Sequence, residues 1–328
     1  MRILPPETYI DGVLAGDRRM LSKTITLIES ALPAHQETAR QILGALLPRT
    51  GNAVRLGITG VPGVGKSTFI ESFGVMLVDK GHRVAVLAVD PSSARSGGSV
   101  MADKTRMERL SQRPEAFIRP SPSGGTLGGV ARKTRETMLV CEAAGFDVVI
   151  VETVGVGQSE ITVASMVDFF LVLLLAGAGD ELQGIKKGIL ELADALAVNK
   201  ADGDNLVRAQ RAARVYELAL HLLQSSSPRW TPPVLTCSAL EMSGIEAIWD
   251  TVVRHRALFG PSGELEERRR QQAVAWTWSL IEEGLKDRFA GMPEIRRQLP
   301  RILHEVERGR LAPTAAAERL LFLLDSAT

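Results

Sequence analysis

A glycine-rich segment that ends in a lysine and a serine is the part of this sequence best suited to chemistry. The segment matches the Walker A pattern in full and reads Gly60-Val61-Pro62-Gly63-Val64-Gly65-Lys66-Ser67. The glycines allow backbone N–H groups to turn inward around phosphate oxygens, and a helix beginning at Lys66 would direct its positive end at them. Lys66 would neutralise the β- and γ-phosphates, the Ser67 hydroxyl would bind Mg²⁺, and Thr68 would lie near the α-phosphate. The segment therefore predicts a site for a nucleoside triphosphate.

A second motif indicates which base that nucleotide carries. Asn199-Lys200-Ala201-Asp202 ends a predicted strand. The Asp202 carboxylate can accept hydrogen bonds from N1–H and the 2-amino group of guanine, and adenine offers neither donor there. Asn199 would hold guanine N7 and the neighbouring loop, and the Lys200 stem would cover the base. Taken alone, the motif is also compatible with a helix cap, since Asp suits that position.

A Ser-Ala pair follows the last predicted strand. Cys237-Ser238-Ala239 is typical of the loop that supports guanine O6 through backbone N–H groups. Ser238 and Ala239 are therefore expected at the base. Because both base motifs follow a Walker A segment in the expected order, we predict that the nucleotide is GTP or GDP.

Two further strands end in carboxylates on the side of the sheet where the phosphates would lie. Asp90 stands in Val-Asp-Pro-Ser-Ser, and Glu152 ends the run Val-Val-Ile-Val-Glu, where many GTPases have Asp. Mg²⁺ takes one or two carboxylates and keeps several waters, so both residues are expected in its shells. Either could instead be an ordinary acid at a strand end. Gly155 could donate its backbone N–H to the γ-phosphate.

The residue that would position the attacking water is not evident. Gln158 lies three residues beyond Gly155, and Arg106 and Arg109 lie in or near a glycine-rich loop that could order over the phosphates. The catalytic set expected from the residues is therefore Lys66, Glu152 and Asp90 with bound Mg²⁺.

Short apolar strands alternate with longer amphipathic helices between residues 51 and 260. The expected strands are 54–59, 83–89, 116–119, 147–152, 169–175, 195–199 and 234–237. Such alternation predicts an α/β fold with a mostly parallel sheet covered by helices on both faces. Residues 1–50 form an N-terminal helical extension and residues 261–328 a C-terminal helical arm, in which Pro293 and Pro300 are expected to break the helix.

The bulk composition excludes several classes of protein. The formal net charge is +1, so no positive field is available for nucleic acid or an anionic membrane. Two distant cysteines, Cys141 and Cys237, indicate neither a disulfide framework nor a zinc site. The first residues lack the apolar core of a signal peptide. The most hydrophobic segment, residues 169–176, is too short to span a bilayer. We therefore expect a cytoplasmic protein.

The order of these motifs resembles the MeaB/ArgK family of G-protein chaperones, whose human member is MMAA. The resemblance is carried by Gly-Val-Pro-Gly-Val-Gly-Lys-Ser-Thr, Val-Asp-Pro-Ser-Ser, Val-Glu-Thr-Val-Gly-Val-Gly-Gln-Ser-Glu and Asn-Lys-Ala-Asp, and covers most of the chain. It implies a SIMIBI-type GTPase core, a homodimer, and an adenosylcobalamin-dependent methylmalonyl-CoA mutase as partner. The residues alone leave open whether the arm packs on the GTPase core or on a second subunit, and the resemblance favours dimerisation through the arm. It also implies that GTP hydrolysis gates loading of the cofactor and that the mutase is protected from inactivation.

The resemblance further implies a switch loop over residues 177–188, in which Lys186 would contact the nucleotide or the partner. A solvated surface lysine is equally compatible with the residues alone. The partner stays open within one class, because isobutyryl-CoA and ethylmalonyl-CoA mutases are cobalamin enzymes too.

Other nucleotide-binding families fit the residues less well. A signal-recognition GTPase usually has Asp where Glu152 stands, and a nickel-delivery GTPase usually needs clustered His or Cys ligands, whereas the five histidines here are scattered. A ParA-like ATPase places lysine where Val61 stands. A transport kinase would need a protein phosphoacceptor, which nothing in the sequence suggests. A binding module without hydrolysis stays open.

Overall fold

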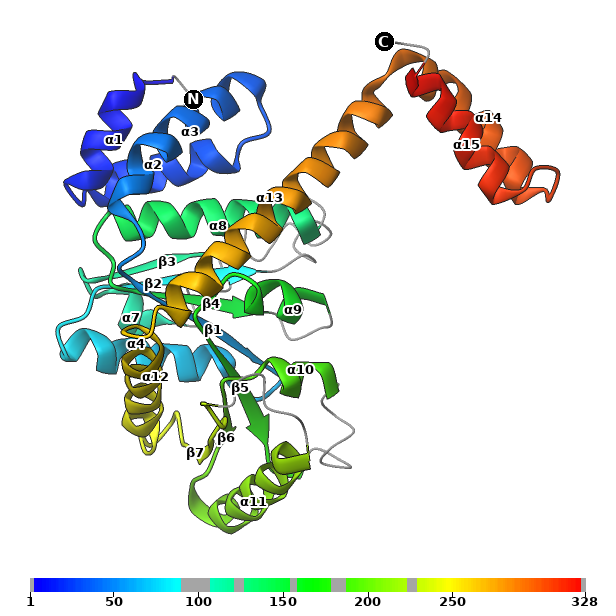
Figure 1. Cartoon of the computed structure of the whole chain (residues 1–328). Helices are drawn as coiled ribbons and strands as arrows, with labels where there is room; N and C mark the ends of the chain where they lie inside the picture. Colours follow the sequence, from blue (N-terminus) through cyan, green and yellow to red (C-terminus); the bar gives the residue numbers. More distant parts are fainter. Residues whose placement is uncertain are drawn as a thin grey trace. The chain divides into compact units, whose positions relative to one another are not determined.

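The computed structural model describes residues 3–89, 107–120, 127–153, 158–177, 187–222 and 229–325 (Figure 1). The chain divides into two compact units, Met1–Arg269 and Arg270–Thr328. Each unit is described by itself below. Within the described ranges, no helix combines the length and the apolar character needed to cross a membrane.

The first unit is built on one sheet of seven parallel strands, in the order β3-β2-β4-β1-β5-β6-β7. This arrangement confirms the predicted α/β class and the predicted parallel sheet. The ends of the strands differ from the predicted ones by one residue at most, because each strand is a short apolar run between polar turns. The strands are β1 Val54–Gly60, β2 Val84–Val89, β3 Ala116–Arg119, β4 Val148–Thr153, β5 Phe169–Leu175, β6 Ala195–Asn199 and β7 Val234–Thr236.

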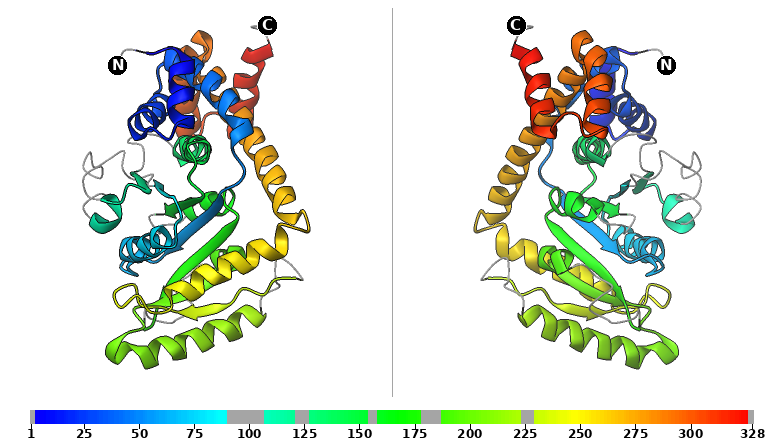
Figure 2. Two further views of the ribbon diagram at one scale, coloured as in Figure 1. Left: turned by 90° about the vertical axis from the view of Figure 1, so that its left-hand side faces the viewer. Right: turned by 90° about the vertical axis from the view of Figure 1, so that its right-hand side faces the viewer.

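Helices cover both faces of the sheet (Figures 1 and 2). Side chains of β5 alternate between two cores: Phe169 and Leu171 face one of them, and Phe170 and Val172 face the other. The first core is completed by α4 (Lys66–Asp79), α7 (Glu108–Ser111) and α12 (Ile245–Phe259). The second is completed by α8 (Leu127–Ala143), α9 (Gln158–Ala164), α10 (Lys187–Leu192) and α11 (Leu206–Leu222).

Three helices precede the sheet, as the helical spacing of the apolar residues predicts. They are α1 (Pro6–Leu14), α2 (Arg18–Glu29) and α3 (Pro33–Leu46), followed by the 3₁₀ turn η1 (Leu47–Arg49). The Asp17 carboxylate caps α2 by accepting from the backbone of Arg19 at 2.7 Å. Leu21 and Ile25 are buried in the same core as α8, so these helices extend the first unit and do not form a core of their own.

The second unit contains most of α13 (Glu264–Gly291), together with α14 (Pro293–Glu307) and α15 (Pro313–Asp325). Pro293 begins α14, but Pro300 lies inside it, so the prediction that Pro300 breaks the helix is wrong. A proline there removes one backbone hydrogen bond. Ile295 and Ile302, on either side of Pro300, are buried in one small core with Ala316 and Leu320 of α15, and this packing offsets the loss.

Candidate nucleotide-binding site

The phosphate loop connects the end of β1 to the start of α4 at the carboxyl edge of the sheet. A Cβ atom at Gly60 would lie 2.6 Å from Leu173 O, so a larger residue would force the adjacent strands apart. Gly63 and Gly65 have φ angles of +80° and +89°, which glycine adopts without strain. Pro62, Gly63 and Thr68 are exposed, while Val64 is buried and anchors the loop. The local sequence therefore forms an open cradle of the kind the Walker A pattern predicts.

Lys66 lies in this cradle and is half-buried. Its ammonium donates hydrogen bonds to Gly60 O at 2.8 Å and Val61 O at 3.4 Å. Burial lowers the pKa of Lys66, whereas the carboxylates of Glu152 and Glu160 favour its charged form. The loop thus holds a cation where the pattern places the β- and γ-phosphates.

Ser67 and Glu152 bring a hydroxyl and a carboxylate together beside the loop. Ser67 Oγ donates to Glu152 Oε1 at 3.5 Å. Glu152 is the second-to-last residue of β4 and pairs in register with Ile58 of β1 and Ala88 of β2. This position at the carboxyl end of the strand explains why Glu152 reaches the phosphate loop. Hard oxygen donors from two elements fit Mg²⁺, which needs few protein ligands when phosphates and waters supply the rest. Asp90, Gly155 and Lys186, also predicted for this site, lie outside the described residues.

Asn199 joins the base-binding motif to the phosphate loop. Its side chain donates to Val64 O at 2.8 Å and accepts from Ala239 N at 3.2 Å. Lys200 has a φ angle of +60° and donates from Nζ to Gly63 O at 2.9 Å. Asn199 is buried at the end of β6. Its side chain therefore links the loop that follows β6 to the phosphate loop and to the loop that contains Ala239.

Asp202 and Ser238 are in direct contact. Ser238 Oγ donates to Asp202 Oδ2 and accepts from Glu241 N at 3.1 Å. The backbone supports the same arrangement, because Ala201 N donates to Cys237 O at 2.9 Å. The sequence predicts Ser238 and Ala239 at the base through backbone groups, and the hydroxyl contact to Asp202 adds a role for the serine side chain. A carboxylate fixed in this way is oriented before any base arrives.

Four buried polar side chains behind the loop were not predicted from the sequence. Thr59 Oγ1 of β1 and Thr153 Oγ1 of β4 lie 2.6 Å apart, and neither residue is more than 2% exposed. Ser159 and Glu160, in the first turn of α9, are 1% and 2% exposed. The sequence carries a weak signal for Glu160, because an acid in the first turn of a helix is common for reasons unrelated to a site.

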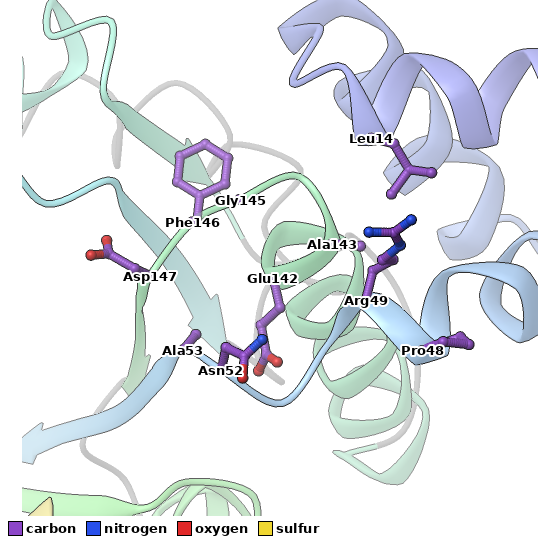
Figure 3. A pocket seen from close by; sticks show the side chains of 10 residues that line it. All are labelled: Leu14, Pro48, Arg49, Asn52, Ala53, Glu142, Ala143, Gly145, Phe146 and Asp147. Carbon is purple, nitrogen blue, oxygen red and sulfur yellow. The ribbon is translucent and has the colours of Figure 1, made fainter.

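A cavity of about 660 Å³ lies at the opposite, amino-terminal edge of the sheet (Figure 3). Its lining includes Arg49, Asn52, Glu142 and Asp147, and none of the residues predicted for nucleotide binding. Glu142 is buried and bound by Gly51 N at 2.6 Å and Arg55 Nε at 2.5 Å. The carboxylate thus serves the fold, and this cavity is separate from the residues predicted for nucleotide binding.

Comparison with known protein families agrees with this geometry. The family model described as methylmalonyl Co-A mutase-associated GTPase MeaB matches residues 21–294. The chain belongs to the MeaB family. The family resemblance predicted from the motifs is therefore confirmed, and the chain is a member of a family of GTPases.

Relatives of this MeaB-family chain cover nearly its whole length. A putative GTPase of Caulobacter vibrioides is 57% identical over 94% of both chains. The GTPase ArgK of Escherichia coli is 49% identical over 93% of this chain and 92% of its own. The mitochondrial methylmalonic aciduria type A homolog of Mus musculus is 47% identical over 94% of this chain and 77% of its own.

A solved structure shares the fold of this MeaB-family chain. The crystal structure named LAO/AO transport system kinase has a TM-score of 0.79 and 41% identity, and covers 99% of each chain. The name of that structure differs from the GTPase names of the relatives, although both match this chain over nearly its whole length. The alternatives of a nickel-delivery or signal-recognition GTPase are not favoured by these matches.

Proposed function

We propose that this protein binds and hydrolyses GTP and serves as a chaperone for an adenosylcobalamin-dependent acyl-CoA mutase, with methylmalonyl-CoA mutase as the first candidate. In this proposal, nucleotide state gates loading of the cofactor and protects the mutase from inactivation. Family membership supports the mutase as partner, because the matching family is named for that association. The proposed specificity for GTP rests on one observation. Ser238 holds the Asp202 carboxylate in a chain that also has a complete phosphate loop.

The phosphate subsite would be made by this chain's own groups as follows. The backbone of residues 60–65 would surround the phosphate oxygens, and Lys66 would exchange the Gly60 carbonyl for the β- and γ-phosphates. Ser67 and Glu152 would hold Mg²⁺, with Asp90 as a second carboxylate. The ion, when bound, offsets negative charge on the transferring phosphoryl group. Phosphoryl transfer to water needs no covalent protein intermediate, so positioning and charge are sufficient.

The base subsite would distinguish guanine by paired hydrogen bonds. Asp202 would accept from N1–H and the 2-amino group, and a base without those donors would leave the carboxylate unpaired. Asn199 would hold N7, and the Lys200 stem would cover the ring. The backbone of Ser238 and Ala239 would donate to O6. Gly155 and Lys186 are proposed as groups that respond to the γ-phosphate.

A hydrolysis assay with and without the mutase tests the proposal. The rate of GTP hydrolysis should rise when methylmalonyl-CoA mutase is added, because the partner would order residues around the phosphates. Complex formation is verified by gel filtration in the same buffer. Equal rates in the confirmed complex would refute the coupling, and failure to bind either GTP or GDP would refute the GTPase assignment itself.

The second unit is proposed as a dimerisation arm. Four apolar residues of α13 follow one another at helical spacing and are more than 40% exposed: Val274, Trp278, Ile281 and Leu285. The small core of α14 and α15 does not include them. A second copy of this chain would cover such a stripe, as the family resemblance implies.

A further inference from the structure

Glu160 is a buried carboxylate beside the phosphate loop that the proposed nucleotide contacts do not use. It is 2% exposed, and within the described residues its carboxylate accepts one hydrogen bond, from Ser159 Oγ at 3.3 Å. Burying an ionised carboxylate is costly unless a positive charge or several donors compensate it. A positive charge is therefore expected close to the Glu160 carboxylate.

The packing of α9 places Glu160 just below the phosphate loop. A Cβ atom at Gly57 of β1 would lie 3.0 Å from Val163 Cγ1, so Val163 rests directly on Gly57. Glu160 precedes Val163 by three residues, a rise of about 4.5 Å in a helix. Thr59 follows Gly57 by two residues, about 6.6 Å along a strand. Because α9 begins near the carboxyl edge of the sheet, Glu160 lies at about the level of Thr59, one residue before the loop.

Two carboxylates act on the Lys66 ammonium in the described part of the chain. Glu152 and Glu160 both favour its charged form. A nucleotide brings further negative charge into the same partly buried space, where charges interact more strongly than in water. Ser67 and Glu152 place the oxygen ligands for a divalent cation at this position. A cation held there would add positive charge to that of Lys66.

We propose that Glu160 makes guanine-nucleotide binding conditional on a divalent cation. Its buried charge opposes nucleotide phosphates when no cation accompanies them and is offset when Mg²⁺ is present. Glu160 acts through the field in the site and is a positioning residue. The inference rests on the proposed function, in which residues 60–67 hold a guanine nucleotide.

The test compares nucleotide affinity with and without Mg²⁺ in the full-length chain. Dissociation constants for a fluorescent GDP analogue are measured in excess Mg²⁺ and in EDTA, for the wild type and Glu160→Gln. In EDTA the variant should bind about tenfold more tightly than the wild type. In Mg²⁺ the two affinities should agree within about threefold, because the cation offsets the carboxylate.

Two control variants separate charge from shape and from general effects. Glu160→Asp retains the charge and should keep the wild-type ratio of the two dissociation constants. Glu191→Gln removes an exposed carboxylate from α10, which contacts α9, and should leave the ratio unchanged because water screens that charge. Glu160→Ala is measured beside Glu160→Gln, with circular dichroism as the test of folding.

Several outcomes would overturn the inference. One is an unchanged ratio of the two dissociation constants in both Glu160→Gln and Glu160→Ala. Another is a loss of affinity that is equal in Mg²⁺ and in EDTA, as a purely structural role requires. In the wild type, the inference requires GTP to bind more weakly than GDP in EDTA, and the reverse order contradicts it even if no variant folds. A wild type that binds no guanine nucleotide in Mg²⁺ would instead refute the proposed function.

Discussion

Asn199 Nδ2 donates a hydrogen bond of 2.8 Å to Val64 O, so the strand end that carries the base-binding motif holds the phosphate loop directly. The same side chain accepts from Ala239 N at 3.2 Å. The proposed phosphate and base subsites, whose residues Val64 and Asn199 are 135 positions apart in the chain, therefore share one buried amide. Loss of this amide would disturb the position of both loops, whereas loss of Asp202 would change only which base is accepted.

Asp202→Asn should weaken GDP binding by about a hundredfold and favour xanthine nucleotides. An amide at this position presents a donor to N1–H of guanine, and two hydrogen bonds to a charged acceptor are lost. Competition of GDP and XDP against a fluorescent guanine nucleotide measures the change. Asn199→Ala should weaken both nucleotides alike.

Asp204→Asn is the matched control for this change, since Asp204 is exposed two residues further on. It should leave both affinities within about twofold, as expected for a screened surface charge. An unaltered base preference in Asp202→Asn would mean that the base binds elsewhere.

Arg269→Met should destabilise the first unit by about 3–5 kcal/mol. Arg269 donates from Nε and Nη2 to the two oxygens of Asp168, at 2.7 Å and 2.6 Å, and from Nη2 to Ala53 O. Asp168 is 7% exposed in its side chain, so the variant leaves a buried carboxylate without its cation. Urea denaturation measures the free energy of unfolding.

A double variant tests whether the loss arises from this pair. Arg269→Met combined with Asp168→Asn should cost less than the sum of the two single changes. Arg270→Met, on an exposed neighbour, should change stability by no more than about 0.5 kcal/mol. Strictly additive losses would mean that the two side chains do not interact.

The free energy of unfolding should decrease as pH is lowered through about 6.5, and His255 should account for part of the slope. Burial lowers the pKa of His255, although Asp194, with Oδ1 3.7 Å from Nε2, partly opposes this. The unfolded chain therefore takes up the proton at higher pH than the folded chain, and acid favours unfolding. Above this window His255 is neutral in both states and adds no slope.

Urea midpoints at pH 7.5 and 5.5 in the wild type and His255→Gln measure this contribution. The variant removes an aromatic contact with Trp230, whose ring centroid lies 5.0 Å away, so it should be less stable at both pH values. The difference in stability should be smaller at pH 5.5. There the unfolded wild type takes up a proton on His255 more readily than the folded wild type, so the wild type loses stability and the variant does not. A deficit that grows as the pH falls would contradict the assignment.

Trp278→Glu should convert a dimer into a monomer if the exposed stripe of α13 is an interface. Trp278 is 62% exposed, and a charge in the centre of an apolar interface is strongly unfavourable. Light scattering over a concentration series measures the mass. Thr277→Glu places the same charge on the exposed neighbouring position and should leave the mass unchanged. A wild type that is monomeric at every concentration would refute the arm's proposed role.

Much of the fold could be predicted from the sequence, because most strands are short apolar runs separated by turns and amphipathic helices. The phosphate loop and Asn199 were recognisable since each motif is short and its residues act from adjacent positions. Pro300 was assigned wrongly because its tolerance depends on the packing of Ile295 and Ile302 against α15.

Other contacts of the structure had no counterpart in the sequence pattern. Arg269 and Asp168 are 101 residues apart and meet only once the sheet is formed. In the sequence Arg269 stands in a run of arginines after two glutamates, which is typical of a solvated helix face. Glu160 ends the motif Val-Glu-Thr-Val-Gly-Val-Gly-Gln-Ser-Glu, but its burial could not be predicted because it follows from how α9 packs on Gly57.

The arginines at the root of α13 also decide where this chain can be shortened. Arg268 and Arg269 neutralise Asp194 and Asp168, and the guanidinium of Arg269 holds the connector that leads into β1 through Gly51 O and Ala53 O. A protease cut or a stop codon after Gly260 would remove both cations and leave two carboxylates buried at the base of the sheet. A chain that ends after Arg270 would keep them. Only the longer fragment is therefore expected to serve as an isolated nucleotide-binding domain.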